Sequence, residues 1–278
     1  MSVLAVLLVG VGLADLVRAA LAAPDSPPGS DGQGRRGWLV ATVVGVVTVL
    51  ALAAAAGLLA VVGGIALTLL AVVSLVSWML LSRAALVGDV GPRVPGSVGY
   101  VLPLAALGLG LVLQLALAGW APPVGGWIDG WARWADLPWE VAPEQAMLVL
   151  GLALVQLATG NVVVRLVLVA TGAMEAAPSV DGADQELRGG RLLGPLERLF
   201  ILGLGLAGEV TAAGLVIAAK GLIRWPELRA HPSPGAGSSD RPDDTAAGPS
   251  GIDKVTEYFL VGSFVSWLVA LTALALAS

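Results

Sequence analysis

The sequence predicts an all-α membrane protein: a polytopic transmembrane bundle of about seven helices, with six also possible, plus one tryptophan-rich interfacial helix. Of the 278 residues, 57% are hydrophobic and only 13% are charged, whereas about 25% are charged in soluble domains. The apolar runs are long enough to cross a bilayer core of about 30 Å, and they lack the short alternating segments of a β-barrel. We expect residues 1–225 and 254–278 to form one transmembrane domain, with a flexible polar loop at 226–253.

The first apolar run extends from Ser2 to Ala23 and predicts the first membrane span. Its end, ALAAP, imitates a signal-peptidase site, but no basic region precedes it. We expect a retained first helix, with a cleaved signal as the alternative. Asp15 and Arg18 are three residues apart, a spacing that places them on one helix face. A satisfied pair at the membrane edge is the favoured interpretation of these two residues.

The next apolar run, Trp38 to Leu86, is too long for one span, because a helix of this length would extend about 73 Å. We expect helices near 38–56 and 60–82, with the turn marked by Gly57 and the Gly63-Gly64 pair. Residues 97–120 predict another span. Gln114 is its strongly polar side chain, and we expect it to hydrogen-bond a neighbouring helix.

The segment from Ala121 to Glu144 differs from the apolar runs, because four tryptophans crowd into it: Trp127, Trp131, Trp134 and Trp139. The first three are spaced four and three residues apart, which puts them on one face of a short helix. Tryptophan favours the membrane interface, so we expect an interfacial anchor. The aromatic face could instead cover a cavity mouth or bind a sugar.

Residues 145–172 predict another span, in which Asn161 and Arg165 share a helix face. The next helix, expected over 191–224, carries the most informative pattern. Its ionisable residues Arg191, Arg198, Glu209 and Lys220 are spaced seven, eleven and eleven apart. In one continuous helix they form a polar stripe, with Glu209 about 16 Å from both Arg198 and Lys220 and therefore near the bilayer midplane.

An intramembrane carboxylate marks a functional site, so Glu209 becomes the leading ion-pathway or ligand-binding candidate. A lone ionised carboxylate in a bundle would cost several kcal/mol, which leaves protonation or a cationic partner. Arg165 is the best-placed partner, with Asn161 beside it. Asp15, Arg18, Glu197 and Glu257 are secondary candidates, and for Glu257 a place near a helix N-terminus is the simpler explanation.

The distribution of basic residues conflicts with a single span at 191–224. Seven spans would place the N-terminus outside and the C-terminus inside, but five cations between Lys220 and Lys254 would then lie outside. A re-entrant hairpin bent at the glycines 203–208 would put both flanks inside. The stripe favours one span, and the basic residues favour the hairpin.

The C-terminal third contains short motifs in a fixed order. They are Gly189-Gly190, Leu196-Glu197-Arg198, Ala218-Ala219-Lys220 and Glu257-Tyr258-Phe259-Leu260-Val261-Gly262. This region resembles the C-terminal membrane part of an uncharacterised bacterial family, catalogued as domain of unknown function 3307. Residues 158–168 extend the resemblance, which covers roughly 100 residues. It implies a bacterial inner-membrane protein in which these charged residues matter together, but no known activity.

The composition excludes several functions. The chain has no cysteine and one histidine, in a loop rich in proline and glycine, so thiolate catalysis, Cys-metal sites and a serine protease with a membrane histidine are excluded. We expect no cofactor, no metal and no nucleic-acid partner. The leading hypothesis is a non-catalytic membrane scaffold or partner subunit in the bacterial plasma membrane, as a partner-bound chain or homo-oligomer. A small-solute or ion/proton transporter is the alternative, and a lipid-modifying enzyme is a lesser one.

Overall fold

The computed structural model describes residues 1–22, 31–87, 96–135, 142–174, 190–229 and 251–277. These residues are helical and contain no strand, which confirms the all-α prediction. The elements are α1 (Ser2–Leu21), α2 (Asp31–Ala55), η1 (Leu58–Ala60), α3 (Val62–Val87), α4 (Gly96–Ala116), η2 (Ala118–Trp120), α5 (Gly126–Ala135), α6 (Pro143–Leu154), η3 (Val155–Thr159), α7 (Gly160–Ala170), α8 (Gly190–Leu206), α9 (Val210–Arg229) and α10 (Gly251–Ala277).

Six helical stretches of the described chain are long and apolar enough to cross a membrane. They are Ser2–Leu21, Arg35–Ala55, Val62–Leu86, Val98–Ala116, Pro143–Ala170 and Tyr258–Ala277. The run at 38–86 does fold back into two helices, with the turn at Gly57. The predicted helices were too short at these ends: α2 begins at Asp31 and not near residue 38, and α9 and α10 extend into the predicted loop, to Arg229 and from Gly251. The rest of the predicted loop, 230–250, lies outside the described residues.

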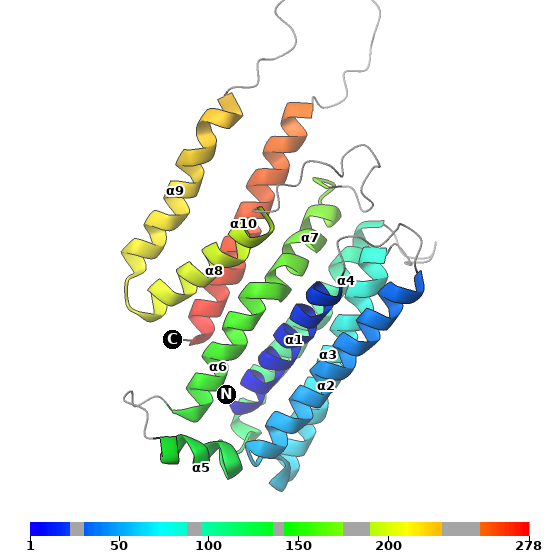
Figure 1. The fold of residues 1–278 in the computed structure, drawn as a ribbon, viewed down its shortest axis with the longest axis vertical. Coiled ribbons are helices and arrows are strands. Elements are labelled where there is room, and N and C mark those ends of the chain that lie inside the picture. Colours follow the sequence, from blue (N-terminus) through cyan, green and yellow to red (C-terminus); the bar gives the residue numbers. More distant parts are fainter. Residues whose placement is uncertain (23–30, 88–95, 136–141, 175–189, 230–250, 278) are drawn as a thin grey trace, which may run out of the picture.

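Helix α1 occupies the centre of the bundle, where α2, α3, α6 and η3 pack around it (Figure 1). Its residues from Ser2 to Gly12 are all buried. This first helix is therefore a core element and not a peripheral anchor. On the next hairpin, the amide Nε2 of Gln114 donates a 2.9 Å hydrogen bond to the Leu67 carbonyl oxygen, which confirms the expected interhelical bond between α4 and α3.

The single long helix expected over 191–224 is wrong, because the chain turns back between α8 and α9 (Figure 1). Gly208 has a φ of 81°, a left-handed conformation that glycine adopts without strain. The Glu209 amide donates to the Leu204 carbonyl at 2.8 Å, and the Gly208 amide donates to Gly205 at 3.1 Å. This pair of bonds is the Schellman motif that ends helices. The stripe is therefore broken at Glu209.

Helix α9 packs extensively on α8 and forms a small second core with it. Ala213 of α9 is buried together with Ile201 of α8 and Ala270 of α10, and Ile217 and Trp267 pack against them. The opposite face of α9 is exposed. That face includes Thr211, Gly214, Leu215, Ala218 and Leu222. The α8–α9 hairpin is thus attached to the bundle along one side.

The hairpin also resolves the conflict over the basic residues. Because α8 and α9 are antiparallel, the basic residues at the start of α8, the end of α9 and the start of α10 lie at the same end of the bundle. The ends of α1 and α3 and the start of α2 lie there as well (Figure 1). These described helix ends carry Arg18, Arg35, Arg36, Arg83, Arg191, Arg224, Arg229 and Lys254. Arg133, on α5, lies at the opposite end.

The topology can be tested with single cysteines, because the chain contains none of its own. We expect Arg191→Cys and Arg229→Cys to react with a membrane-impermeant maleimide from the same side of sealed vesicles. Arg133→Cys should react from the other side. Labelling of positions 191 and 229 from opposite sides would show that the segment crosses the membrane once and would contradict the hairpin.

Candidate functional site

A π-helical segment, η3, interrupts the helix that runs from α6 to α7. It covers Val155–Thr159 and lies against α1 on one side and α8 on another. In a π-helix the hydrogen bonds run from i to i+5, so the regular backbone ladder is disturbed at that turn, and such turns frequently occur at functional sites. Gln156 and Thr159, the polar residues of this segment, are fully buried. The segment thus places polar groups inside an apolar bundle.

Arg198 of α8 reaches the backbone of this segment with its guanidinium group. Its Nε and Nη2 atoms donate to the Gln156 carbonyl oxygen at 3.1 Å and 2.8 Å. Nη2 also donates to Asn161 Oδ1 at 2.6 Å, and Nη1 donates to Ser266 Oγ of α10 at 3.1 Å. Arg198 is 2% exposed. A buried arginine therefore joins α8, η3, α7 and α10.

Gly160 makes room for this guanidinium group. A Cβ atom at position 160 would lie 2.7 Å from Nε and 2.9 Å from Cζ of Arg198, closer than such atoms normally approach. Any other residue would therefore push the guanidinium group away from the Gln156 carbonyl. Along the sequence, Gln156 supplies a carbonyl acceptor, Gly160 leaves space for the guanidinium group, and Asn161 supplies a second acceptor.

The residue before Arg198 also holds α10. Glu197 is buried, and its Oε1 accepts a 2.9 Å hydrogen bond from the indole Nε1 of Trp267. Ser266 and Trp267 are thus bound by the neighbouring residues Arg198 and Glu197. We expect the hydrogen bonds of Glu197 and Arg198 to Trp267 and Ser266 to fix the rotation of α8 relative to α10.

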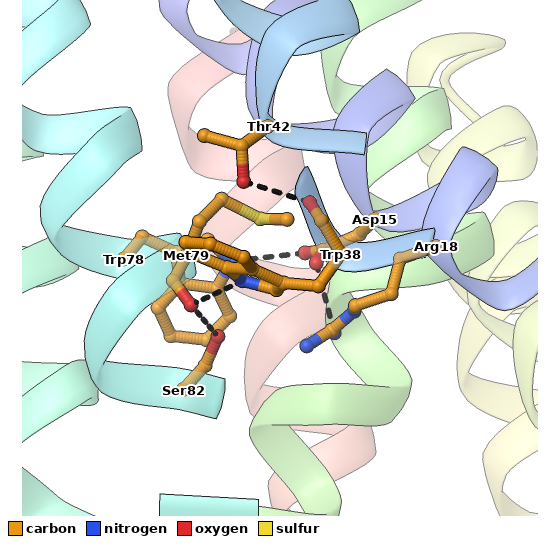
Figure 2. Close-up of polar contacts among 7 residues, drawn as sticks. All are labelled: Asp15, Arg18, Trp38, Thr42, Trp78, Met79 and Ser82. Carbon is orange, nitrogen blue, oxygen red and sulfur yellow. Dashed lines mark hydrogen bonds and ion pairs between the residues drawn. The ribbon is translucent and has the colours of Figure 1, made fainter. Parts of the chain in front are cut away.

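A second buried polar cluster surrounds Asp15 of α1 (Figure 2). Its Oδ2 accepts a 3.0 Å hydrogen bond from the indole Nε1 of Trp78, on α3. Its Oδ1 lies 2.8 Å from Nη2 of Arg18, and this contact is an ion pair without the alignment of a hydrogen bond. Asp15 is buried, while the Arg18 side chain is 19% exposed. The expected pairing of Asp15 with Arg18 is confirmed, and Trp78 is an additional partner.

Beside this cluster, Trp38 of α2 is hydrogen-bonded to α3 (Figure 2). The indole Nε1 of Trp38 donates to the Met79 carbonyl oxygen at 2.9 Å. The Arg83 guanidinium lies over the Trp38 ring, 5.0 Å from its centroid, within the range of a cation–π interaction. Two tryptophans with satisfied N–H groups thus tie α3 to α1 and to α2.

The π-helical segment lies between the two clusters. The Thr159 hydroxyl lies beside the Asp15 carboxylate, yet it has no hydrogen-bond partner among the described atoms. The Gln156 side chain points the other way, since its Nε2 lies 3.4 Å from the Val269 carbonyl oxygen of α10. Its Oε1 is buried without a partner. One turn of helix therefore faces Asp15 on one side and Arg198 on the other.

The leading candidate from the sequence, Glu209, does not belong to this site. It lies in the exposed turn between α8 and α9, where its carbonyl oxygen accepts the first backbone bond of α9 from Ala213 at 3.0 Å. Arg165 is exposed on α7. Glu209 and Arg165 are both described and form no ion pair with each other, whereas Asp15–Arg18 and Asp129–Arg133 do, so the predicted Glu209–Arg165 pair is wrong. The helix break removes Glu209 from the bundle interior.

The other predicted residues divide into two groups. Arg198 and Asn161 do meet, and Glu197, Asp15 and Arg18 are all bound, as described above. Lys220 lies on α9 and Glu257 in the second turn of α10, but their side chains lie outside the described part of the structure. The sequence reasoning missed Gln156, Gly160, Ser266 and Trp267 around Arg198 and Glu197, and it missed Trp78 beside Asp15. Nothing distinguishes Ser266 from other serines on apolar helices, so its sequence carries no signal.

The tryptophan-rich segment does form a short helix, α5, from Gly126 to Ala135. Trp127, Trp131 and Trp134 are exposed by 73%, 48% and 81%. Trp139 lies in 136–141, outside the described residues. The helix lies across the end of the bundle that carries the chain's N-terminus (Figure 1), the position expected of an interfacial helix. Trp127, Trp131 and Trp134 line an open hollow on the surface of this helix.

Comparisons of the chain with protein families, with curated proteins and with solved structures find no match. The resemblance in the C-terminal third therefore stays a prediction.

The Arg198 site can be tested through Gly160. We expect Gly160→Ala to lower the free energy of unfolding by about 2–4 kcal/mol, because the displaced guanidinium loses charged hydrogen bonds and stays buried. Gly203→Ala is the matched control, since a Cβ there meets nothing within 4 Å, and it should change stability by less than about 1 kcal/mol. The measurement is denaturant unfolding in detergent micelles. Equal effects of the two variants would contradict the role of the gap.

The Asp15 cluster can be tested through its tryptophan. We expect Trp78→Phe to destabilise the protein by about 1–3 kcal/mol, because a buried carboxylate loses its N–H donor. Trp120→Phe serves as the control, since Trp120 is 67% exposed. Thermal unfolding in the same detergent compares the two variants. An unchanged midpoint for Trp78→Phe would show that the hydrogen bond contributes nothing.

Proposed function

We propose that this protein is a non-catalytic membrane scaffold or partner subunit of a bacterial plasma membrane, and that its α8–α9 hairpin binds a transmembrane helix of another protein. The observation that carries the proposal is the exposed face of α9. It combines small residues with leucines at helical spacing: Thr211, Gly214, Leu215, Ala218 and Leu222.

The exposed face of α9 suits a helix better than lipid. Helix pairs in membranes are stabilised by close packing, and small residues allow the two backbones to approach. Gly214 and Ala218 are four residues apart, one turn along the same side, and a Cβ at position 214 meets nothing within 4 Å. The adjacent Leu215 and Leu222 supply large side chains that can pack beside a partner.

The buried charges support a structural function rather than a catalytic one. Arg198 donates four hydrogen bonds within the chain, and these bonds hold the base of the hairpin against η3 and α10. A rigid base lets α9 present one defined face. The transport hypothesis has less support, because it depended on Glu209 at the midplane, and Glu209 lies in the hairpin turn.

The basic residues support an orientation for the proposed subunit. Since cytoplasmic ends of spans carry an excess of Lys and Arg, the end with Arg35, Arg83 and Arg229 is the cytoplasmic one. The turn of the hairpin, helix α5 and both ends of the chain then lie on the outer side. This assignment moves the C-terminus from the inside, where seven spans had placed it, to the outside.

Site-specific photo-crosslinking in native membranes tests the proposal. We expect a photoreactive residue at Leu215 to give a protein adduct of discrete mass. The same residue at Val43, which is 59% exposed on α2, should give lipid adducts only. Adding Gly214→Leu should remove the Leu215 adduct, because the larger side chain prevents close approach. An adduct of twice the chain's mass identifies a second copy as the partner. Lipid adducts alone at both positions would overturn the proposal.

A further inference from the structure

A notch on the outer surface of α5 has walls and a floor of different chemistry. Its volume is about 450 Å³, and it is lined by Trp127, Trp131, Trp134, Gly126 and Gly130. The tryptophans form one wall. Gly130 forms the floor, since a Cβ there would meet nothing within 4 Å, whereas a Cβ at Gly126 would lie 2.9 Å from the Ala55 carbonyl oxygen. The notch is therefore open because Gly130 has no side chain on this face.

A charged pair lies beside the notch, outside the residues that line it. Arg133 follows Gly130 by three residues, so at about 100° per residue it borders Gly130 on the side away from the tryptophans. Arg133 forms an ion pair with Asp129, and the two side chains are 75% and 32% exposed. The tryptophans and the charged pair thus lie on opposite sides of Gly130.

The position of α5 limits what can enter. The Gly125 amide donates a 2.9 Å hydrogen bond to the Ala56 carbonyl oxygen, which fixes the start of α5 at the end of the span Arg35–Ala55. The helix lies across the ends of the spans in Figure 1. A helix at this level meets the headgroups of the bilayer, where tryptophan is enriched.

We propose that this notch binds the headgroup of a zwitterionic phospholipid. The ammonium group of the lipid lies against the indole faces, which attract cations through their ring quadrupoles. The phosphate group faces Arg133, and Asp129 balances the ammonium. A zwitterionic headgroup offers an opposite charge to each member of the Arg133–Asp129 pair, whereas an anionic headgroup offers no ammonium to the indole faces or to Asp129.

Native mass spectrometry of the full-length protein tests the binding. The protein is purified in detergent and offered equal amounts of phosphatidylethanolamine, phosphatidylglycerol, diacylglycerol and glucosyl-diacylglycerol. We expect phosphatidylethanolamine to be retained at least about tenfold more than the other three, as one to two cation–π contacts and one phosphate contact predict.

Two leucine substitutions separate the notch from general lipid contact. Gly130→Leu should reduce retention of phosphatidylethanolamine to the level of diacylglycerol. The leucine side chain would fill the notch, and its Cβ atom would clash with no other atom of the protein. Gly108→Leu, at another open glycine on α4, should leave retention unchanged. Equal retention of all four lipids, preference for the glucosyl or the glycerol headgroup, or an equal loss in both variants would overturn the proposal.

Discussion

A guanidinium group inside an apolar bundle must find its acceptors within the protein, and much of this fold follows from that requirement. A charged side chain at the centre of a membrane helix costs about 2.5–3.5 kcal/mol on insertion scales. Arg198 offsets this cost with hydrogen bonds to a backbone carbonyl, an amide and a hydroxyl. Regular helices have few free carbonyls in their interiors. The Gln156 carbonyl oxygen of the π-helical turn at Val155–Thr159 accepts two of the bonds from Arg198.

The same turn explains how the two halves of the bundle are connected. Helix α1 packs along η3 on one side, and Asp15 of α1 lies beside Thr159. Arg198 and Gln156 connect the other side of η3 to α8 and α10. A change in the rotation of this turn would move both sets of contacts together. The buried polar groups are therefore arranged around one segment and not along one helix, as the spacing of charged residues had indicated.

The sequence predicted the class of fold because apolar run length is a strong constraint in lipid. It also predicted local partners: Asp15 with Arg18, and Gln114 with a neighbouring helix. It could not predict where the helix at 191–224 would end. The Schellman turn at Gly208 has no proline, and the polar residues near it are Glu209 and Thr211, so a helix stop resembled the middle of a span. The π-helical turn and Ser266 left no pattern either, because their roles depend on packing between distant segments.

Arg198 holds the α8–α9 hairpin through acceptors in and after the π-helical turn. A double-mutant cycle between Arg198→Met and Asn161→Ala measures the coupling of these two side chains, with the free energy of unfolding determined for all four proteins in one detergent. We expect a coupling of about 1–3 kcal/mol, because each single variant removes the same charged hydrogen bond. Additive effects, with no coupling beyond about 0.5 kcal/mol, would contradict it.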